Sequence, residues 1–188
     1  MGVSVVNVSR QLASRVVLRA PAQEDREEFV AAMRASRRLH EPWLTAPASA
    51  VEFARLLQRA AGERFESQLV RRREDDAIVG FFNLSEIVRG SLQSAYLAYG
   101  AVAGFERRGY MSEGLLLLLN HAFKALGMHR VEANIQPANI GSIALVRRAG
   151  FVREGYSERY LKIGGRWRDH ERWAMRAEQW RVLRSVKN

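Results

Sequence analysis

The chain has 188 residues, a formal net charge of +10 and an apolar fraction of 47%. This length fits one domain with one sizeable core, and the apolar fraction excludes a disordered chain. Because cysteine is absent, disulfides, thiolate nucleophiles and cysteine metal sites are excluded, which fits a reducing compartment.

The start of the chain, MGVSVVNVSRQ, makes a poor secretion signal because Ser4 and Asn7 interrupt its apolar run. No run of about 18 apolar residues exists, so we expect no membrane-spanning segment and a cytoplasmic location. Arginine supplies nearly all of the positive charge. A basic surface favours polyanionic partners, such as nucleic acid, the ribosome or a phosphorylated cofactor, with simple solubility as the alternative.

The first half of the chain predicts helices followed by a hairpin-linked sheet. Apolar residues at helical spacing indicate two early helices, and alternation with turn residues indicates the strands. We expect a strand over 15–20, a helix over 25–38, a loop over 40–47, a helix through 53–60 that ends at Gly62, and strands over 65–72, 78–88 and 92–102.

The second half predicts a buried helix and then a crossover. Five consecutive leucines, 115–119, indicate a helix that is apolar on nearly every side and therefore buried. We then expect a strand over 131–135, a short helix from the N-cap Asn139 to Arg148, strands over 154–163 and 167–175 joined by Gly164–Gly165, and a basic helix from Ala177. The order predicts a mixed α/β sheet in a single domain, 1–188, with its core over about 16–180.

The turn over 104–109, GFERRG, joins the third strand of the hairpin-linked sheet to the leucine helix. It lacks the Lys and Ser/Thr of a nucleotide P-loop, and the dinucleotide fingerprint is absent. A tight turn that opens a helix leaves several backbone N–H groups unpaired, and the helix dipole adds positive potential. Arg107 and Arg108 add charge, so the residues alone leave two interpretations open: a metal-free diphosphate site, or an ordinary turn with solvated arginines.

Two segments resemble the GNAT acetyltransferase family. FERRGYMSEG (105–114) is similar to its cofactor motif, and IQPANIGSIALVRRAGF (135–151) is similar to its second signature. VRGSLQSAYLAYG and EGYSERYLKIGGRWRDH resemble the RimJ/RimL branch, most closely the RimJ type. The resemblance covers about residues 16–180. It implies a GNAT fold with a mixed, mostly antiparallel sheet of six to seven strands, splayed in the middle and flanked by about four helices, and acetyl-CoA as cosubstrate without a metal.

The sequence departs from the family pattern at three positions. Glu106 replaces the usual Gln or Arg that opens the cofactor loop, and Met111 replaces a common small residue. Val146 stands where many members have a general-acid tyrosine. An acidic side chain beside a diphosphate is unfavourable unless it points away, and the acid must come from another residue or from water.

The resemblance also implies roles for individual residues. A main-chain donor on the splayed strand would meet the acetyl carbonyl. Glu86 is the candidate base for the amine, Ser142 the candidate acid for the CoA thiolate, and Asn139 combines a helix cap with a pantetheine contact. The expected cofactor-binding residues are Tyr99, Gly100, Ala101, Arg107, Arg108, Gly109, Tyr110, Met111, Ser112 and Asn139.

Strand alternation in the run Trp167–His170 puts Trp167, Asp169 and Trp173 on one face and Arg168 and His170 on the other. One face should line the acceptor groove, and alternation does not say which. The four histidines show no metal-ligand spacing.

Three functions fit these patterns. The first is acetylation of a protein N-terminus, for example that of a ribosomal protein, with ribosome association. The second is acetylation of a small amine, an amino acid or an antibiotic. The third is a non-catalytic module that binds CoA or the ribosome. A monomer and a homodimer both remain open.

Overall fold

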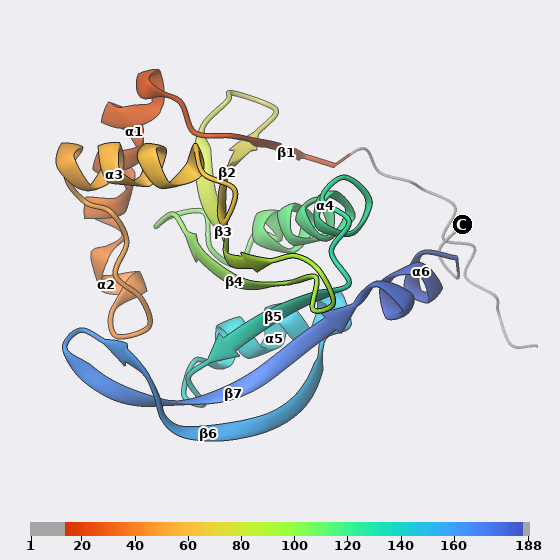
Figure 1. Ribbon diagram of the computed structural model, residues 1–188. Helices are drawn as coiled ribbons and strands as arrows, with labels where there is room; N and C mark the ends of the chain where they lie inside the picture. The colour runs from red at the N-terminus through yellow and green to blue at the C-terminus, as the bar shows by residue number, and fades with distance from the viewer. Residues whose placement is uncertain (1–13, 186–188) are drawn as a thin grey trace, which may run out of the picture.

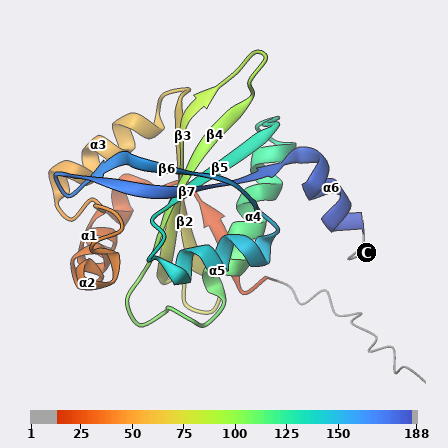
Figure 2. The same cartoon turned by 90° about the horizontal axis from the view of Figure 1, so that it is seen from below.

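A computed structural model describes residues 14–185 (Figure 1). Helices cover both faces of one central sheet (Figures 1 and 2). Along the chain the elements are β1 (Val16–Arg19), the 3-10 helix η1 (Gln23–Asp25), α1 (Arg26–Ala35), α2 (Arg37–His40), α3 (Ala50–Ala60), β2 (Phe65–Arg72), β3 (Ile78–Val88), β4 (Ser94–Ala101), α4 (Tyr110–Lys124), β5 (Arg130–Ile135), α5 (Ile140–Ala149), β6 (Val152–Ile163), β7 (Arg166–Arg176) and α6 (Ala177–Ser185).

The sheet has seven strands in the order β1-β2-β3-β4-β5-β7-β6. Only β4 and β5 are parallel, and the other neighbours pair antiparallel. This confirms the expected mixed, mostly antiparallel sheet. Helices α4 and α5 lie on one face and α1 and α3 on the other (Figure 2).

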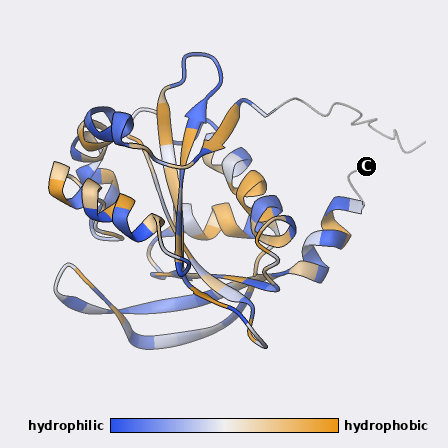
Figure 3. Ribbon diagram, turned by 45° about the horizontal axis from the view of Figure 1, so that its top comes forward, coloured by the Kyte–Doolittle hydropathy of each residue, from blue (hydrophilic) through white to orange (hydrophobic). Residues whose placement is uncertain are grey.

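Each face of the sheet has its own apolar core. The leucine helix α4 buries Leu115, Leu118 and Leu119 completely or nearly so against the strands, while Leu116 and Leu117 are partly buried. Phe29, Phe53 and their neighbours fill the second core under α1 and α3. Figure 3 shows the apolar colour of α4 and the inner strands and the more polar β6–β7 hairpin.

The early helix over 25–38 is wrong as a single element. The structure has η1 first, then α1, and α2 begins after Ser36, whose φ of −89° and ψ of 2° depart from helical geometry. The Ser36 hydroxyl donates to the Ala32 carbonyl at 2.7 Å and accepts the Ala103 N–H at 2.9 Å. This tie to a distant loop explains the break. With the short α2 and the expected C-terminal α6, residues 14–185 hold six α-helices rather than about four.

The parallel pair at the centre of the sheet is short. β4 and β5 pair only from Ser94–Arg130 to Tyr96–Glu132, and no pairing follows although both strands continue. The strands therefore splay apart, as expected, and the edge of β4 from Leu97 to Ala101 faces an opening. Among the helices of residues 14–185, none is long and apolar enough to cross a membrane.

A buried ionic cluster fastens η1 to the sheet. Asp25 is 2% exposed, and its carboxylate accepts from Arg71 and Arg19 at 2.5 Å each and from the Ala22 N–H at 2.7 Å. Burial acts to raise the pKa of Asp25, but these hydrogen bonds and the arginine charges outweigh it and hold the pKa below its usual value. The cluster therefore stabilises the fold while Asp25 is ionised.

We expect Asp25→Asn to lower the free energy of unfolding by about 3 kcal/mol, the lower end for breaking a buried ion pair, because Arg71 loses its one buried carboxylate and keeps only the more exposed Glu28 and Asp76. A lowered pKa in the folded state means that the wild-type contribution is complete above pH ~4 and is lost as pH falls below that value. Urea unfolding at pH 7 and pH 3 measures both effects. Glu24→Gln, at an exposed neighbouring position, is the control, and equal stability of both variants at pH 7 would contradict the assignment.

Candidate active site

The turn between β4 and α4 leaves a row of free amides. Arg107 and Gly109 have left-handed φ values of +61° and +88°, a backbone geometry that favours anion-binding nests of successive N–H groups. None of the hydrogen bonds between described residues uses the amides of residues 107–111, whereas Ser112 and Glu113 already donate to the Gly109 carbonyl. The turn is therefore a cradle of free amides, with the geometry to accept an anion, at the positive end of a 15-residue helix.

Glu106 does not oppose this cradle through a free carboxylate. Its carboxylate accepts the Gly104 N–H at 2.5 Å, so the side chain closes its own turn. Gly104, with a φ of +89°, permits the turn. The departure from the family pattern at Glu106 thus has a local structural role.

Arg15 holds the turn from the edge of the sheet. Its main-chain N–H and its Nε both donate to the Glu113 carboxylate at 2.7 Å, and its Nη2 donates to the Arg108 carbonyl at 2.9 Å. The guanidinium also lies 4.8 Å from the centre of the Tyr110 ring. Because Glu113 lies in the first turn of α4, these contacts fix the turn relative to the helix.

A cavity of about 690 Å³ runs from this cradle along the free edge of β4. Most of the predicted cofactor residues line it: Tyr99, Gly100, Ala101, Arg107, Gly109, Tyr110, Met111, Ser112 and Asn139. Arg108 does not line it. Its guanidinium lies 5.8 Å from the centre of the Phe105 ring. Met111 packs against Gly80, where a Cβ would collide with the Met111 sulfur.

The end of β4 is supported by a histidine in place of a strand partner. His40 is 4% exposed, and its Nε2 donates to the Ala101 carbonyl at 2.8 Å. Burial lowers the pKa of His40 more than this hydrogen bond raises it, so the ring is neutral. Gly100 leaves room for it, because a Cβ there would lie 2.9 Å from Nε2 and 2.7 Å from the Phe81 ring.

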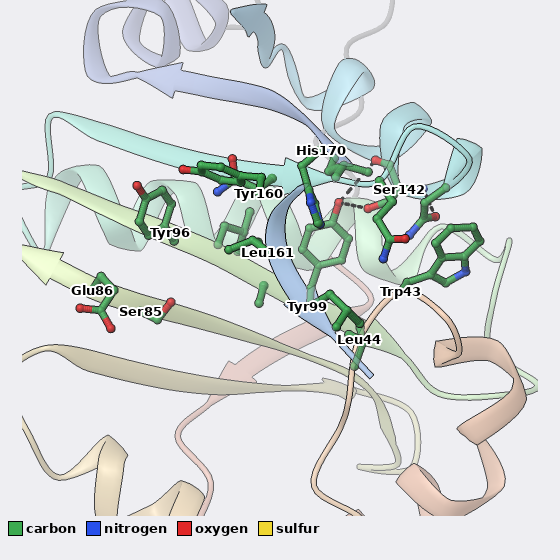
Figure 4. Close-up of a pocket in the computed structure, with 17 residues that line it drawn as sticks. Trp43, Leu44, Ser85, Glu86, Tyr96, Tyr99, Ser142, Tyr160, Leu161 and His170 are labelled. Carbon is green, nitrogen blue, oxygen red and sulfur yellow. Dashed lines mark hydrogen bonds between the residues drawn. The ribbon is translucent and has the colours of Figure 1, made fainter. Parts of the chain in front are cut away.

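A second cavity, of about 380 Å³, opens on the other side of the splay (Figure 4). Trp43, Leu44, Tyr99, Asn139 and Ser142 line both cavities, so the two spaces meet there. The loop that carries Trp43 is tied to the end of β5, because the Gln136 amide donates to the Pro42 carbonyl at 3.1 Å. A molecule that enters by one cavity can therefore reach a molecule in the other.

Two hydroxyl groups meet at this junction. Tyr99 on β4 and Ser142 on α5 share a hydrogen bond between their side-chain oxygens (Figure 4). Burial raises the pKa of the Tyr99 phenol above its usual value, more than the bond to Ser142 lowers it, so the phenol stays protonated at neutral pH. Asn139 caps α5 by accepting the Ser142 N–H at 3.1 Å, as the sequence predicts.

The other candidates lie at different places. Val146, which stands where many family members have a tyrosine, is fully buried in the core. The tyrosine that contacts Ser142 in this structure is Tyr99. Glu86 lines the second cavity, but Figure 4 draws it at the opposite end from Ser142. Its carboxylate pairs with Arg64 at 2.9 Å and is 60% exposed. The structure therefore brings Tyr99, Asn139 and Ser142 together and leaves Glu86 apart.

The last strand contributes a histidine. His170 on β7 is 2% exposed and lines the second cavity, whereas Trp167 is 61% exposed and does not line it. The face of β7 that carries His170 is therefore the one that faces the groove. Among the described residues, no group of three His, Cys, Asp or Glu side chains is arranged to hold a metal ion.

Several residues of the site cannot be identified from the sequence alone. His40, Trp43, Gln136 and the Arg15–Glu113 contact carry no motif, and their partners lie far away in the chain. Tyr99 and Ser142 are candidates individually, but nothing in the sequence pairs residues 43 positions apart. The signal that the sequence does offer is position, since His40, Tyr99, Gln136 and Ser142 lie at or near the ends of predicted strands and helices.

Strand β4 separates from its parallel neighbour β5 and leads into the free amides at the start of α4. This arrangement is typical of proteins that bind acyl-CoA. Residues 15–152 match the acetyltransferase (GNAT) domain family, so the chain belongs to that family.

Relatives and solved structures agree with this. The chain is 36% identical over 107 residues to the ribosomal protein uS5-alanine N-acetyltransferase of Escherichia coli (strain K12), covering 57% of this chain and 55% of that protein. The aligned segments thus span about half of the curated relatives. Mycobacterium smegmatis RimJ in complex with CoA-disulfide superposes with a TM-score of 0.81 at 26% identity, covering 92% and 89% of the chains. A Vibrio cholerae spermidine N-acetyltransferase with CoA and spermine shares the fold, with a TM-score of 0.77, 21% identity and coverage of 89% and 98%.

Proposed function

We propose that this protein transfers the acetyl group of acetyl-CoA to the N-terminal α-amino group of a protein. The observation that carries the proposal is the junction at Tyr99 and Ser142, where an amide-lined cavity meets a second cavity across the splay. Direct transfer needs a thioester and an amine held within reach in one place. The junction provides that place.

The cofactor would occupy the larger cavity. Its diphosphate would accept hydrogen bonds from the free amides of residues 107–111, with Arg107 adding charge. The pantetheine arm would lie along the unpaired edge of β4 and reach Asn139, which brings the thioester to Tyr99. The complex of Mycobacterium smegmatis RimJ with CoA-disulfide supports this assignment.

Acyl transfer needs stabilisation of an oxyanion and a proton for the thiolate. Alternate N–H groups of β4 beyond Tyr96 point into the splay, where they can donate to the developing oxyanion. The Ser142 hydroxyl would protonate the CoA sulfur, with the neutral phenol of Tyr99 as its hydrogen-bond partner. The Tyr99–Ser142 pair would therefore act as the general acid, a role that the apolar side chain of Val146 cannot fill.

The charge of the second cavity favours a protein N-terminus over a polyamine. Among the described residues that line it, Glu86 carries the only carboxylate, and Arg64 already neutralises it. A polyamine carries several ammonium groups, which would lie without anions among apolar and uncharged polar side chains. A peptide N-terminus brings one ammonium and an extended backbone that suits the open strand edge.

The net charge of +10 supports an acceptor on an RNA-containing particle such as the ribosome, because phosphates attract a basic protein. We place the reaction in the cytoplasm, where acetyl-CoA and nascent ribosomal proteins meet.

Incubation of the full-length protein with acetyl-CoA and Ala- or Ser-starting peptides, each with an internal lysine, tests the proposal. We expect acetylation only at the N-terminus, with kcat/KM about 100-fold above that for spermidine, equivalent to about 2.7 kcal/mol. Mass spectrometry of the products and a thiol-release assay measure this. Preferred acetylation of spermidine would refute the acceptor assignment, and no turnover with any amine would refute the transferase.

The cradle gives a second prediction. We expect Gly109→Ala to weaken CoA binding about tenfold, because an L-residue resists the left-handed region by about 1–2 kcal/mol. The added Cβ would also lie 3.0 Å from the Arg15 guanidinium. Gly127→Ala is the matched control, since Gly127 has a φ of +64°, open space around it and no place in either cavity. Calorimetry should show weaker binding only for the first variant.

The hydrogen-bonded hydroxyls of Tyr99 and Ser142 give a third prediction. We expect Ser142→Ala and Tyr99→Phe each to lower kcat about 100-fold, because each removes part of the acid. Since they act as one unit, the double variant should lose little more than either single variant. Tyr156→Phe, which removes a hydrogen bond to Asp169 outside both cavities, is the control. Losses that multiply in the double variant would show that the two hydroxyls act independently.

A further inference from the structure

His170 combines burial with a free ring nitrogen on the acceptor side of the junction. It is 2% exposed, and its side chain lines the second cavity together with Tyr99 and Ser142 (Figure 4). Its Nδ1 lies 2.9 Å from the Arg168 carbonyl. No hydrogen bond with a described residue occupies Nε2.

The hydrogen bond at Nδ1 decides which tautomer is present. A carbonyl oxygen can only accept, so Nδ1 must carry the proton and donate it. Nε2 then bears a lone pair in the neutral ring. Burial lowers the pKa of His170 more than the Arg168 carbonyl and the Asp169 charge raise it, so the ring is neutral at pH 7 and can accept a proton.

The groups around the ring do not compete for this role. Tyr160 on β6 faces it with ring centres 6.2 Å apart. The Asp169 carboxylate accepts from the Tyr156 hydroxyl and the Arg159 N–H at 2.6 and 2.8 Å, and it does not line the cavity. Tyr99 is held by Ser142. Glu86 lies at the far end of the cavity and pairs with Arg64.

We propose that His170 Nε2, rather than Glu86, is the general base that removes the proton from the acceptor amine. The inference rests on the proposed acetyl transfer, because it takes the second cavity as the acceptor site. It identifies the base by placement, since His170 lines the same cavity as Tyr99 and Ser142 and its Nε2 has no hydrogen-bond partner among the described residues.

The proton balance follows directly. The ammonium first gives one proton to Nε2, which passes it to water. The amine lone pair then forms the C–N bond as the C–S bond breaks, and the new amide nitrogen gives its surplus proton to Nε2. The departing thiolate takes a proton from the Ser142 hydroxyl, which is restored from the imidazolium. The net products are the amide, CoA and one proton released to water, and His170 returns to its starting tautomer.

Nitrogen-15 NMR of the wild-type protein tests the first half of the proposal without any acceptor. We expect His170, assigned through the backbone, to show a protonated Nδ1 and a bare Nε2 at pH 7, with a pKa below about 6.5. A protonated Nε2 or a charged ring at pH 7 would overturn the proposal, whatever the fate of the acetyl-transfer assignment.

Kinetics test the second half. We expect His170→Gln to lower kcat/KM about 100-fold at pH 7 and by less than about tenfold at pH 9, where an α-amine of pKa about 8 is already deprotonated. His129→Gln, an exposed histidine paired with Glu178, is the matched control and should retain wild-type rates. CoA affinity and Tm show whether the variant is folded, and His170→Asn provides a second substitution.

A defect equal at both pH values, or a His170→Gln rate within threefold of the wild type, would overturn the role of His170 as base. Absence of turnover by the wild type would instead refute the proposed function, and the NMR result would still decide the tautomer.

Discussion

The site depends on one structural constraint, the end of β4–β5 pairing after Tyr96–Glu132. An unpaired strand edge inside a sheet is costly, because buried amides and carbonyls need partners. Here His40 satisfies the Ala101 carbonyl, and the residues from Leu97 to Ala101 line the two cavities. The same gap that leaves hydrogen-bonding groups free for a ligand also connects the two sides of the sheet.

The surrounding structure keeps this opening from closing. Arg15 and Glu113 fix the start of α4 on one side, and Gln136 ties the Trp43 loop to β5 on the other. Both contacts join elements far apart in the chain, so the opening is a property of the whole fold. A rigid rim of this kind is what preorganised donors require, since donors that must reorganise stabilise a transition state less.

Local sequence predicts much of this arrangement. The seven strands, the leucine helix, the Asn139 cap and the amide-rich turn follow from periodicity and from residues with strong conformational preferences. The break at Ser36 and the pairing of Tyr99 with Ser142 do not, because their partners lie 67 and 43 residues away. Glu106 also shows the limit: its charge predicts conflict with an anion, but its hydrogen bond to Gly104 is visible only in three dimensions.

The distribution of charge separates the tasks of the two cavities. The cofactor side carries two arginines, free amides and the Glu106 carboxylate, which accepts the Gly104 N–H. The acceptor side has a neutral histidine, hydroxyls and a single carboxylate that is already paired. A neutral acceptor cavity favours the uncharged amine over the ammonium, because desolvation penalises the charged form. The base then needs only modest strength, which a buried imidazole provides and an exposed carboxylate in an ion pair does not.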